Sequence, residues 1–119
     1  MMFLSIALVA WTAAVPYSAP PVGPFPASPV TRIDTVTQEL IAIALPRGGS
    51  GLMWRGARRF DVRVVKPLYE ADIPNTDVVV FVLLAAHAGT TTVLYGLTNG
   101  EHPKAYRAAR FKITVAPRD

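Results

Sequence analysis

The feature that most constrains the fold is a series of short apolar runs from Thr31 onward, closed by proline, glycine or asparagine. In the run Leu40–Leu45, the large side chains of Ile41, Ile43 and Leu45 share one face. A repeat of two residues is typical of a β-strand that buries one face and exposes the other. The body of the chain is therefore expected to consist of strands.

Four further runs extend this pattern along the chain. Phe60–Val65 alternates and is followed by Pro67, which is expected to end the strand. Val78–Leu84 is apolar throughout, which predicts a central strand buried on both faces. Thr90–Leu97 is expected to pair with that run as a hairpin, and Tyr106–Val115 to end the domain. The turn signals between the runs are Arg47–Gly51, Pro74–Asp77, His87–Gly89 and Asn99–Gly100.

The fold class follows from the number of strands. No segment has the period of an amphipathic helix, and six to seven short strands separated by turns predict an all-β, immunoglobulin-like β-sandwich. The chain has no cysteine, so no disulfide can form and the core depends on sheet packing alone. The absence of thiols also excludes thiolate zinc sites and thiol catalysis.

The first part of the chain differs from this body. Phe3–Val15 is an apolar run that is too short to span a bilayer as a helix but fits the apolar core of a signal peptide. Six prolines follow between residues 16 and 29 and favour an extended spacer. We expect residues 1–19 to be a signal peptide or apolar leader, residues 20–31 a proline-rich spacer and residues 32–119 the sandwich domain. The protein is then secreted or periplasmic, and is attached to a membrane only if the leader is not cleaved.

The net charge of +4 has two interpretations. Arg55, Arg58, Arg59 and Arg63 carry much of the excess, and they form either a solvated strand face or a patch that steers an acidic partner. Nucleic acid is not the expected partner, because no aromatic residues interleave with these arginines as stacking would require.

Catalytic motifs are missing from the sequence. The glycine-rich run before Leu52 is not a nucleophile elbow, because G-x-S-x-G needs glycine at that position. His87 and His102 stand beside turn residues and are interpreted as polar surface groups. No metal-binding, P-loop or dinucleotide motif occurs. We expect a protein that is not an enzyme and has no metal, cofactor or small-molecule substrate.

Two segments carry a family resemblance. Gln38–Trp54 joins an alternating strand, a terminal proline, a glycine-bearing loop and a tryptophan. It resembles the chagasin-like cysteine-protease inhibitors, in which a G-D/E-x-L-x-I-x-L-P strand leads into an N-P-T-T-G-Y-x-W loop. Val80–Tyr95 is similar to the family's F-x-F-x-A-x-x-x-G-T-T-x-L segment. The matching residues are Glu39, Ile43, Leu45, Pro46, Gly51 and Trp54 in the first segment, and Phe81, Ala85 and Gly89 in the second.

The resemblance implies a function and a set of contact residues. Family members are immunoglobulin-like sandwiches without disulfides that place three loops from one end in the active-site cleft of papain-like cysteine proteases. The expected partner is therefore such a protease, with no cofactor. The protease-binding residues implied are Arg47, Gly48, Gly49, Ser50, Gly51 and Leu52 over the catalytic cysteine, Asn75, Thr76 and Asp77 in a second loop, and His102 and Pro103 in a third.

The first loop also has a physical interpretation of its own. Its glycines allow positive φ and a close approach of the backbone to the nucleophile, although the same glycines also suit a simple flexible turn. Trp54 is expected in the core, as in many sandwiches. Leu52 and Met53 are the expected exposed apolar contacts.

The loops also depart from the family pattern, and this leaves a second function open. The first loop lacks the family's asparagine and proline, and His102-Pro103-Lys104 stands where the family has R-P-W. Since an aromatic anchor often dominates an interface, the alternative is a secreted immunoglobulin-like binding or adhesion module without protease-inhibitory activity.

Overall fold

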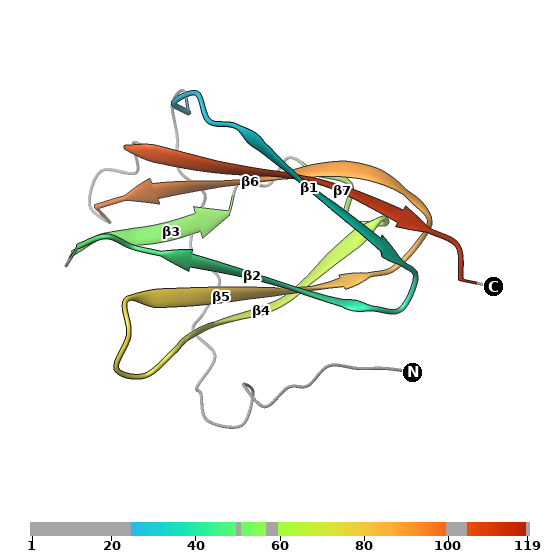
Figure 1. The fold of residues 1–119 in the computed structure, drawn as a ribbon, viewed down its shortest axis with the longest axis horizontal. Helices are drawn as coiled ribbons and strands as arrows, with labels where there is room; N and C mark the ends of the chain where they lie inside the picture. Colours follow the sequence, from blue (N-terminus) through green and yellow to red (C-terminus); the bar gives the residue numbers. More distant parts are fainter. Residues whose placement is uncertain (1–24, 50, 57–59, 100–104, 119) are drawn as a thin grey trace.

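The computed structural model describes residues 25–49, 51–56, 60–99 and 105–118, which form two packed β-sheets (Figure 1). One sheet has the order β1-β7-β6-β3 and the other the order β2-β5-β4. This arrangement confirms the predicted all-β sandwich. The described residues contain no helix long and apolar enough to cross a membrane. The strands are β1 (Val30–Val36), β2 (Leu40–Pro46), β3 (Met53–Gly56), β4 (Val65–Asp72), β5 (Val78–Ala85), β6 (Gly89–Thr98) and β7 (Arg107–Ala116).

The pairing of β2 with β5 forms the centre of the smaller sheet. The strands are antiparallel, with Ile41 opposite Leu83 and Ile43 opposite Phe81. β2 alternates strictly between buried and exposed residues, as its period predicts. β5 lies between β2 and β4, and its consecutive residues from Val79 to Leu83 are all buried. The prediction of a central strand covered on both faces is therefore confirmed.

The predicted hairpin between Val78–Leu84 and Thr90–Leu97 is wrong. Both edges of β5 are occupied by β2 and β4, so β6 joins the other sheet, where it lies between β3 and β7. The turn at residues 86–89 crosses between the sheets, and the amide of Ala86 donates to the carbonyl of Val64 at 2.8 Å. Gly89 has a φ of 152° and a Cβ there would lie 2.9 Å from Val64, so this crossing requires glycine.

The expected strand Phe60–Val65 is also wrong. Residues 60–64 turn instead, because the amides of Val64 and Val65 donate to the carbonyl of Asp61 and its carboxylate accepts from the amide of Arg63. Such local bonds compete with a strand ladder. β4 begins at Val65 and continues past Pro67, where the register shifts. A proline is tolerated there because β4 is an edge strand.

β1 and β7 join the two ends of the domain in one parallel pair. Tyr106–Val115 was expected as a strand and β7 runs from Arg107 to Ala116, so this prediction is confirmed within a residue. β1 begins at Val30, directly after the last proline of the expected spacer. The guanidinium of Arg110 donates to the carbonyl of Pro26 and to the hydroxyl of Ser28. Pro26 and Ser28, which fall in the expected spacer, are thus bound to the sandwich.

The core lies between the sheets and is centred on aromatic residues. The rings of Phe81 and Tyr95 come from opposite sheets with centroids 4.4 Å apart, and Phe111 meets the edge of Tyr95 at 6.1 Å. Trp54 is buried in the same cluster, as predicted. Packing of this kind replaces the disulfide that many small sandwiches use.

We expect Leu97→Ala to lower the free energy of unfolding by about 2–5 kcal/mol, because it leaves a cavity in the core. Leu97 is 1% exposed, whereas Leu68 on the edge strand β4 is 43% exposed. Leu68→Ala is therefore the matched control and should change the free energy of unfolding by less than about 1 kcal/mol. Urea denaturation of both variants checks this. Equal losses in the two variants would contradict the assigned core.

Candidate functional site

Three connections meet at one end of the sandwich, at the left of Figure 1. The first loop, residues 47–52, joins β2 to β3, and the second loop, residues 73–77, joins β4 to β5. The third loop, residues 99–106, joins β6 to β7 and is described only at its two flanks. We call these three loops together the loop end. The arrangement at one end that the family resemblance implies is thus present in the described parts.

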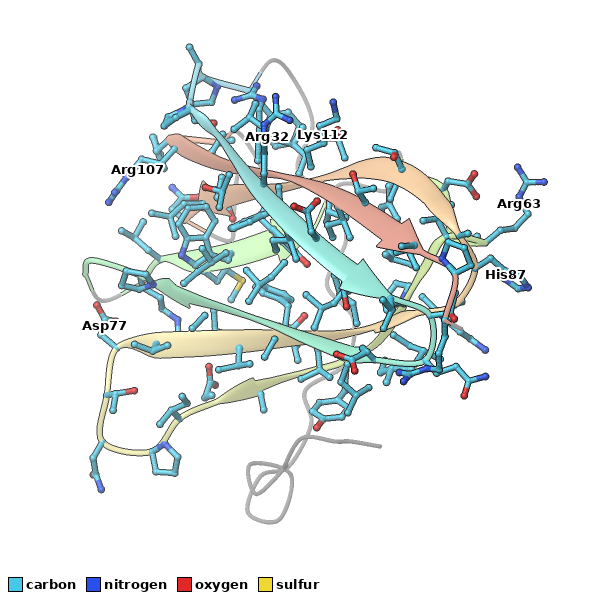
Figure 2. The ribbon with its side chains drawn as sticks, turned by 45° about the vertical axis from the view of Figure 1, so that its right-hand side comes forward. Arg32, Arg63, Asp77, His87, Arg107 and Lys112 are labelled. Carbon is cyan, nitrogen blue, oxygen red and sulfur yellow. The ribbon has the colours of Figure 1, made fainter. Side chains whose placement is uncertain are left out.

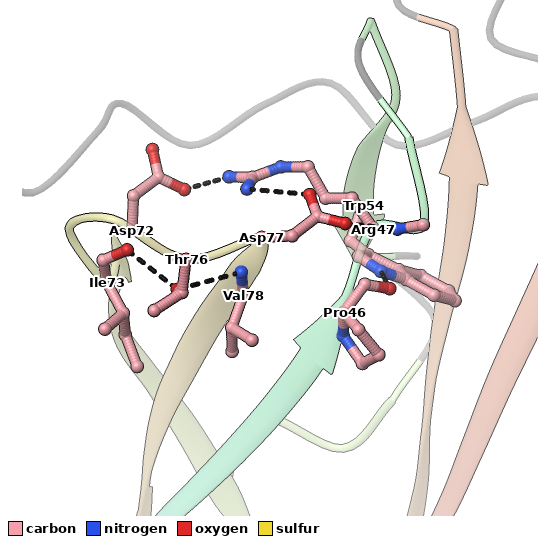
Figure 3. A network of polar contacts seen from close by, with 9 residues as sticks. Pro46, Arg47, Trp54, Asp72, Ile73, Thr76, Asp77 and Val78 are labelled. Atoms are coloured by element: carbon pink, nitrogen blue, oxygen red, sulfur yellow. Dashed lines mark hydrogen bonds and ion pairs between the residues drawn. The ribbon is translucent and has the colours of Figure 1, made fainter.

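A tryptophan closes the base of the first loop. The indole of Trp54 is buried, and its Nε1–H donates to the carbonyl oxygen of Pro46 at 2.9 Å (Figure 3). Pro46 ends a strand of the smaller sheet and Trp54 belongs to the larger one. This bond therefore fixes the distance between the two ends of the loop and joins the two sheets at the same point.

The backbone of the first loop uses two of its glycines in the left-handed region. Gly48 has a φ of 80° and Gly51 a φ of 79°. A Cβ on Gly51 would meet nothing within 4 Å, so its backbone faces open space. Positive φ explains why glycine occupies both positions. The open backbone at Gly51 also permits a close approach by another molecule.

The second loop is a tight turn held by its own threonine. The hydroxyl of Thr76 donates to the carbonyl of Ile73 at 2.8 Å and accepts from the amide of Val78 at 3.2 Å (Figure 3). Asn75 has a φ of 62°, a conformation that asparagine tolerates better than most residues. The expected turn at Pro74–Asp77 is confirmed.

Polar contacts bind the first and second loops to each other. The amide of Arg47 donates to the carbonyl of Asp77 at 2.9 Å, and the amide of Gly48 donates to the Asp77 carboxylate at 2.7 Å. The guanidinium of Arg47 pairs with Asp72 and lies 4.0 Å from Asp77. These contacts make the two loops one structural unit.

A half-buried carboxyl group lies close to this pair of loops. Burial first, and then the negative charge of Asp72, raise the pKa of Glu70 to about 7, although the charges of Arg47 and Arg55 act in the opposite direction. The group is therefore largely neutral in acidic solution and titrates close to neutral pH.

The structure places most of the predicted contact residues together at the loop end. Gly48, Gly51 and Asn75 are exposed there, and Met53 beside them is 39% exposed. Leu52 differs from expectation, because its side chain packs partly against the core and does not project. The remaining predicted residues at the described loop end are Arg47, Gly49, Thr76 and Asp77. Ser50, His102 and Pro103 lie outside the described residues.

Three residues at the loop end were missed by sequence reasoning. Asp72 is not among the predicted contacts, because the sequence predicts a strand at Phe60–Val65 where the structure has β4 at Val65–Asp72. Tyr106 is 54% exposed, and its hydroxyl accepts from the side-chain amide of Asn99 at 3.3 Å, whereas the sequence predicts it as the first residue of the last strand. The Nη1 atom of Arg107 lies 3.5 Å from where a Cβ on Gly48 would stand. In the sequence, the one signal for Tyr106 is that it is an aromatic residue close to a predicted turn.

The described arginines of the basic stretch are divided over the molecule. Arg63 lies beside His87 at the end opposite the loop end (Figure 2) and forms an ion pair with Asp61 at 3.2 Å. Arg55 lies on β3, where its guanidinium contacts the sulfur of Met53. Among the described residues, no group of three or more histidine or acidic side chains is placed to hold a metal ion. Arg58 and Arg59, the other two arginines of this stretch, lie outside the described residues.

Comparison with known proteins yields a structural likeness. No family model matches the chain, and no curated protein matches it in sequence. Among solved structures, the cysteine protease inhibitor EhICP2 from Entamoeba histolytica superposes with a TM-score of 0.54 at 16% identity. The match covers 72% of this chain and 94% of that one. At this identity the likeness shows a shared fold. It therefore confirms the fold that the sequence resemblance implies.

We expect Glu70→Gln to flatten the pH dependence of stability. Because the folded pKa, about 7, lies above the ordinary value of 4.5, the folded state binds this proton more tightly than the unfolded state. The stability contributed by Glu70 therefore falls as the pH rises from 4.5 to about 7. The variant should be more stable than the natural protein at pH 8 and equal to it at pH 4. Urea denaturation across this range measures the difference, and an unchanged slope would contradict the raised pKa.

Proposed function

We propose that this protein inhibits papain-like cysteine proteases by placing the loop end in their active-site cleft. The observation that carries the proposal is the gathering of the loops at one end of a sandwich, with the open backbone of Gly51 projecting from a base closed by Trp54. The fold shared with a cysteine protease inhibitor supports it. The proposed partner is a protein, and no cofactor takes part.

The physical basis of inhibition is preorganisation. A chain that binds in a protease cleft without being cut must hold its backbone in a fixed shape close to the nucleophile. Loops that are already ordered lose little conformational entropy on binding, so more of the contact energy appears as affinity. The bonds from Trp54 to Pro46 and from Gly48 to Asp77 provide this order before any protease is met.

We also propose that the protein acts outside the cytoplasm. The support is the apolar run Phe3–Val15 and the prolines that follow it. N-terminal sequencing of the mature protein tests this proposal. A start between residues 14 and 20 is the expected result, and a chain beginning at Met1 in a membrane fraction would show that the leader serves as an anchor.

The proposed function predicts competitive inhibition of papain by the purified domain, and a specific sensitivity at Gly51. A side chain at positive φ costs roughly 1–2 kcal/mol. Gly51→Ala should therefore weaken inhibition roughly five- to thirty-fold, because the bound conformation of the loop becomes strained. A fluorogenic peptide assay gives the inhibition constants.

Two matched variants separate strain from other effects. Gly49→Ala adds the same methyl group, but Gly49 does not have positive φ and the Cβ would only contact Leu52 at 3.5 Å. His87→Ala changes the opposite end of the sandwich. His87→Ala should inhibit like the natural protein, and Gly49→Ala should lose less inhibition than Gly51→Ala because it adds a methyl group to the loop without backbone strain. Absence of inhibition by the natural protein against several papain-like enzymes at micromolar concentration would reject the proposal and favour the adhesion-module alternative.

A further inference from the structure

The carboxylate of Asp77 serves the first loop although it belongs to the second. Its Oδ2 atom accepts the amide of Gly48 at 2.7 Å, and its Oδ1 atom lies 4.0 Å from the guanidinium of Arg47 (Figure 3). Its backbone carbonyl accepts the amide of Arg47 at 2.9 Å. Asp77 thus holds two consecutive amides at the point where the chain leaves β2.

The turn that contains Asp77 is completed by a different side chain. The hydroxyl of Thr76 bonds to both sides of that turn, at Ile73 and Val78. The bonds of the Asp77 carboxylate to described residues go to the first loop. An aspartate in such a turn commonly bonds to the backbone of its own turn. The carboxylate of Asp77 instead bonds to the first loop, which indicates that its role is to hold that loop.

The position of the Gly48 amide explains why this bond matters. Gly48 has a φ of 80°. Because glycine can adopt many other backbone conformations, this one is not fixed by the residue itself and needs a bond to hold it. The loop is closed at its far end by Trp54, and the bond to Asp77 fixes its near end. Without the Asp77 carboxylate, the near end of the described loop would keep the bond from the Arg47 amide to the Asp77 carbonyl and the pairing of Arg47 with Asp72, but the Gly48 amide would lose its acceptor.

We infer that Asp77 is a positioning residue that keeps the first loop in the conformation of an inhibitor and prevents it from behaving as a substrate. The inference rests on the proposed function and adds a role to one residue of the loop end. A protease cleaves segments that can adapt to its cleft, so a loosened loop becomes a site of cleavage. Loss of the carboxylate therefore converts lasting inhibition into temporary inhibition.

The variant Asp77→Ala tests this inference, with Asp61→Ala as the matched control. Asp61 also accepts a backbone amide, pairs with an arginine and is partly exposed, but its partner Arg63 lies at the opposite end of the sandwich. Asp77→Asn keeps an oxygen for the Gly48 amide but not the charge, and should lie between the natural protein and Asp77→Ala. It also supplies a folded comparison if the alanine variant does not fold.

Two measurements read the loop directly, without reference to inhibition. Hydrogen exchange of the Gly48 amide, followed by NMR, should accelerate about tenfold in Asp77→Ala, as expected for loss of a bond to a charged acceptor. Limited digestion with subtilisin should cut residues 47–52 faster in this variant than in Asp61→Ala. Unchanged exchange and unchanged cleavage would overturn the inference, whether or not the natural protein inhibits papain.

Incubation with papain gives the functional readout. Asp77→Ala should inhibit at first and then lose inhibition over time, with cleavage within residues 47–52 detected by mass spectrometry. Asp61→Ala should keep its inhibition, and Asp77→Asn should lose it more slowly than Asp77→Ala. Lasting inhibition by Asp77→Ala would overturn the inference, whereas failure of the natural protein to inhibit would reject the proposed function and leave the exchange result to decide the role of Asp77.

Discussion

The hydrogen bond from the Trp54 indole to the carbonyl of Pro46 is the contact on which the rest of the site depends. The ring lies in the core between the sheets, and its N–H reaches the base of the first loop. A buried tryptophan usually needs a partner for this group, and here the partner belongs to the opposite sheet. One side chain therefore packs the core, joins the sheets and sets the width of the loop.

The two ends of the sandwich are organised differently, although both carry an aspartate–arginine pair. At the loop end, Arg47 lies between Asp72 and Asp77 and connects segments that are distant in sequence. At the other end, Asp61 pairs with Arg63, which is only two residues further along the chain and lies in the same turn. The first arrangement couples loops, whereas the second only shapes one connection. This asymmetry is why the loop end is the candidate binding surface.

Much of the fold could be predicted from local patterns. The period of β2, the apolar run of β5 and the turn before β5 were all readable because single segments encode them. The sheet to which β6 belongs was not readable, because it depends on whether the edges of β5 are already occupied. The turn at Asp61 was missed because alternation alone does not reveal a carboxylate that bonds to its own backbone. The loop contacts of Asp72 and Asp77 depend on strand placement and were beyond the sequence.

The most direct test of this account is hydrogen exchange of the whole protein, followed by mass spectrometry, with and without papain whose catalytic cysteine is blocked by a small methylthio group. The account predicts new protection in residues 47–52 and 73–77 and at the flanks of the third loop, with none around Arg63 and His87. Protection confined to a sheet face or to the opposite end, or no protection with saturating papain, would contradict it.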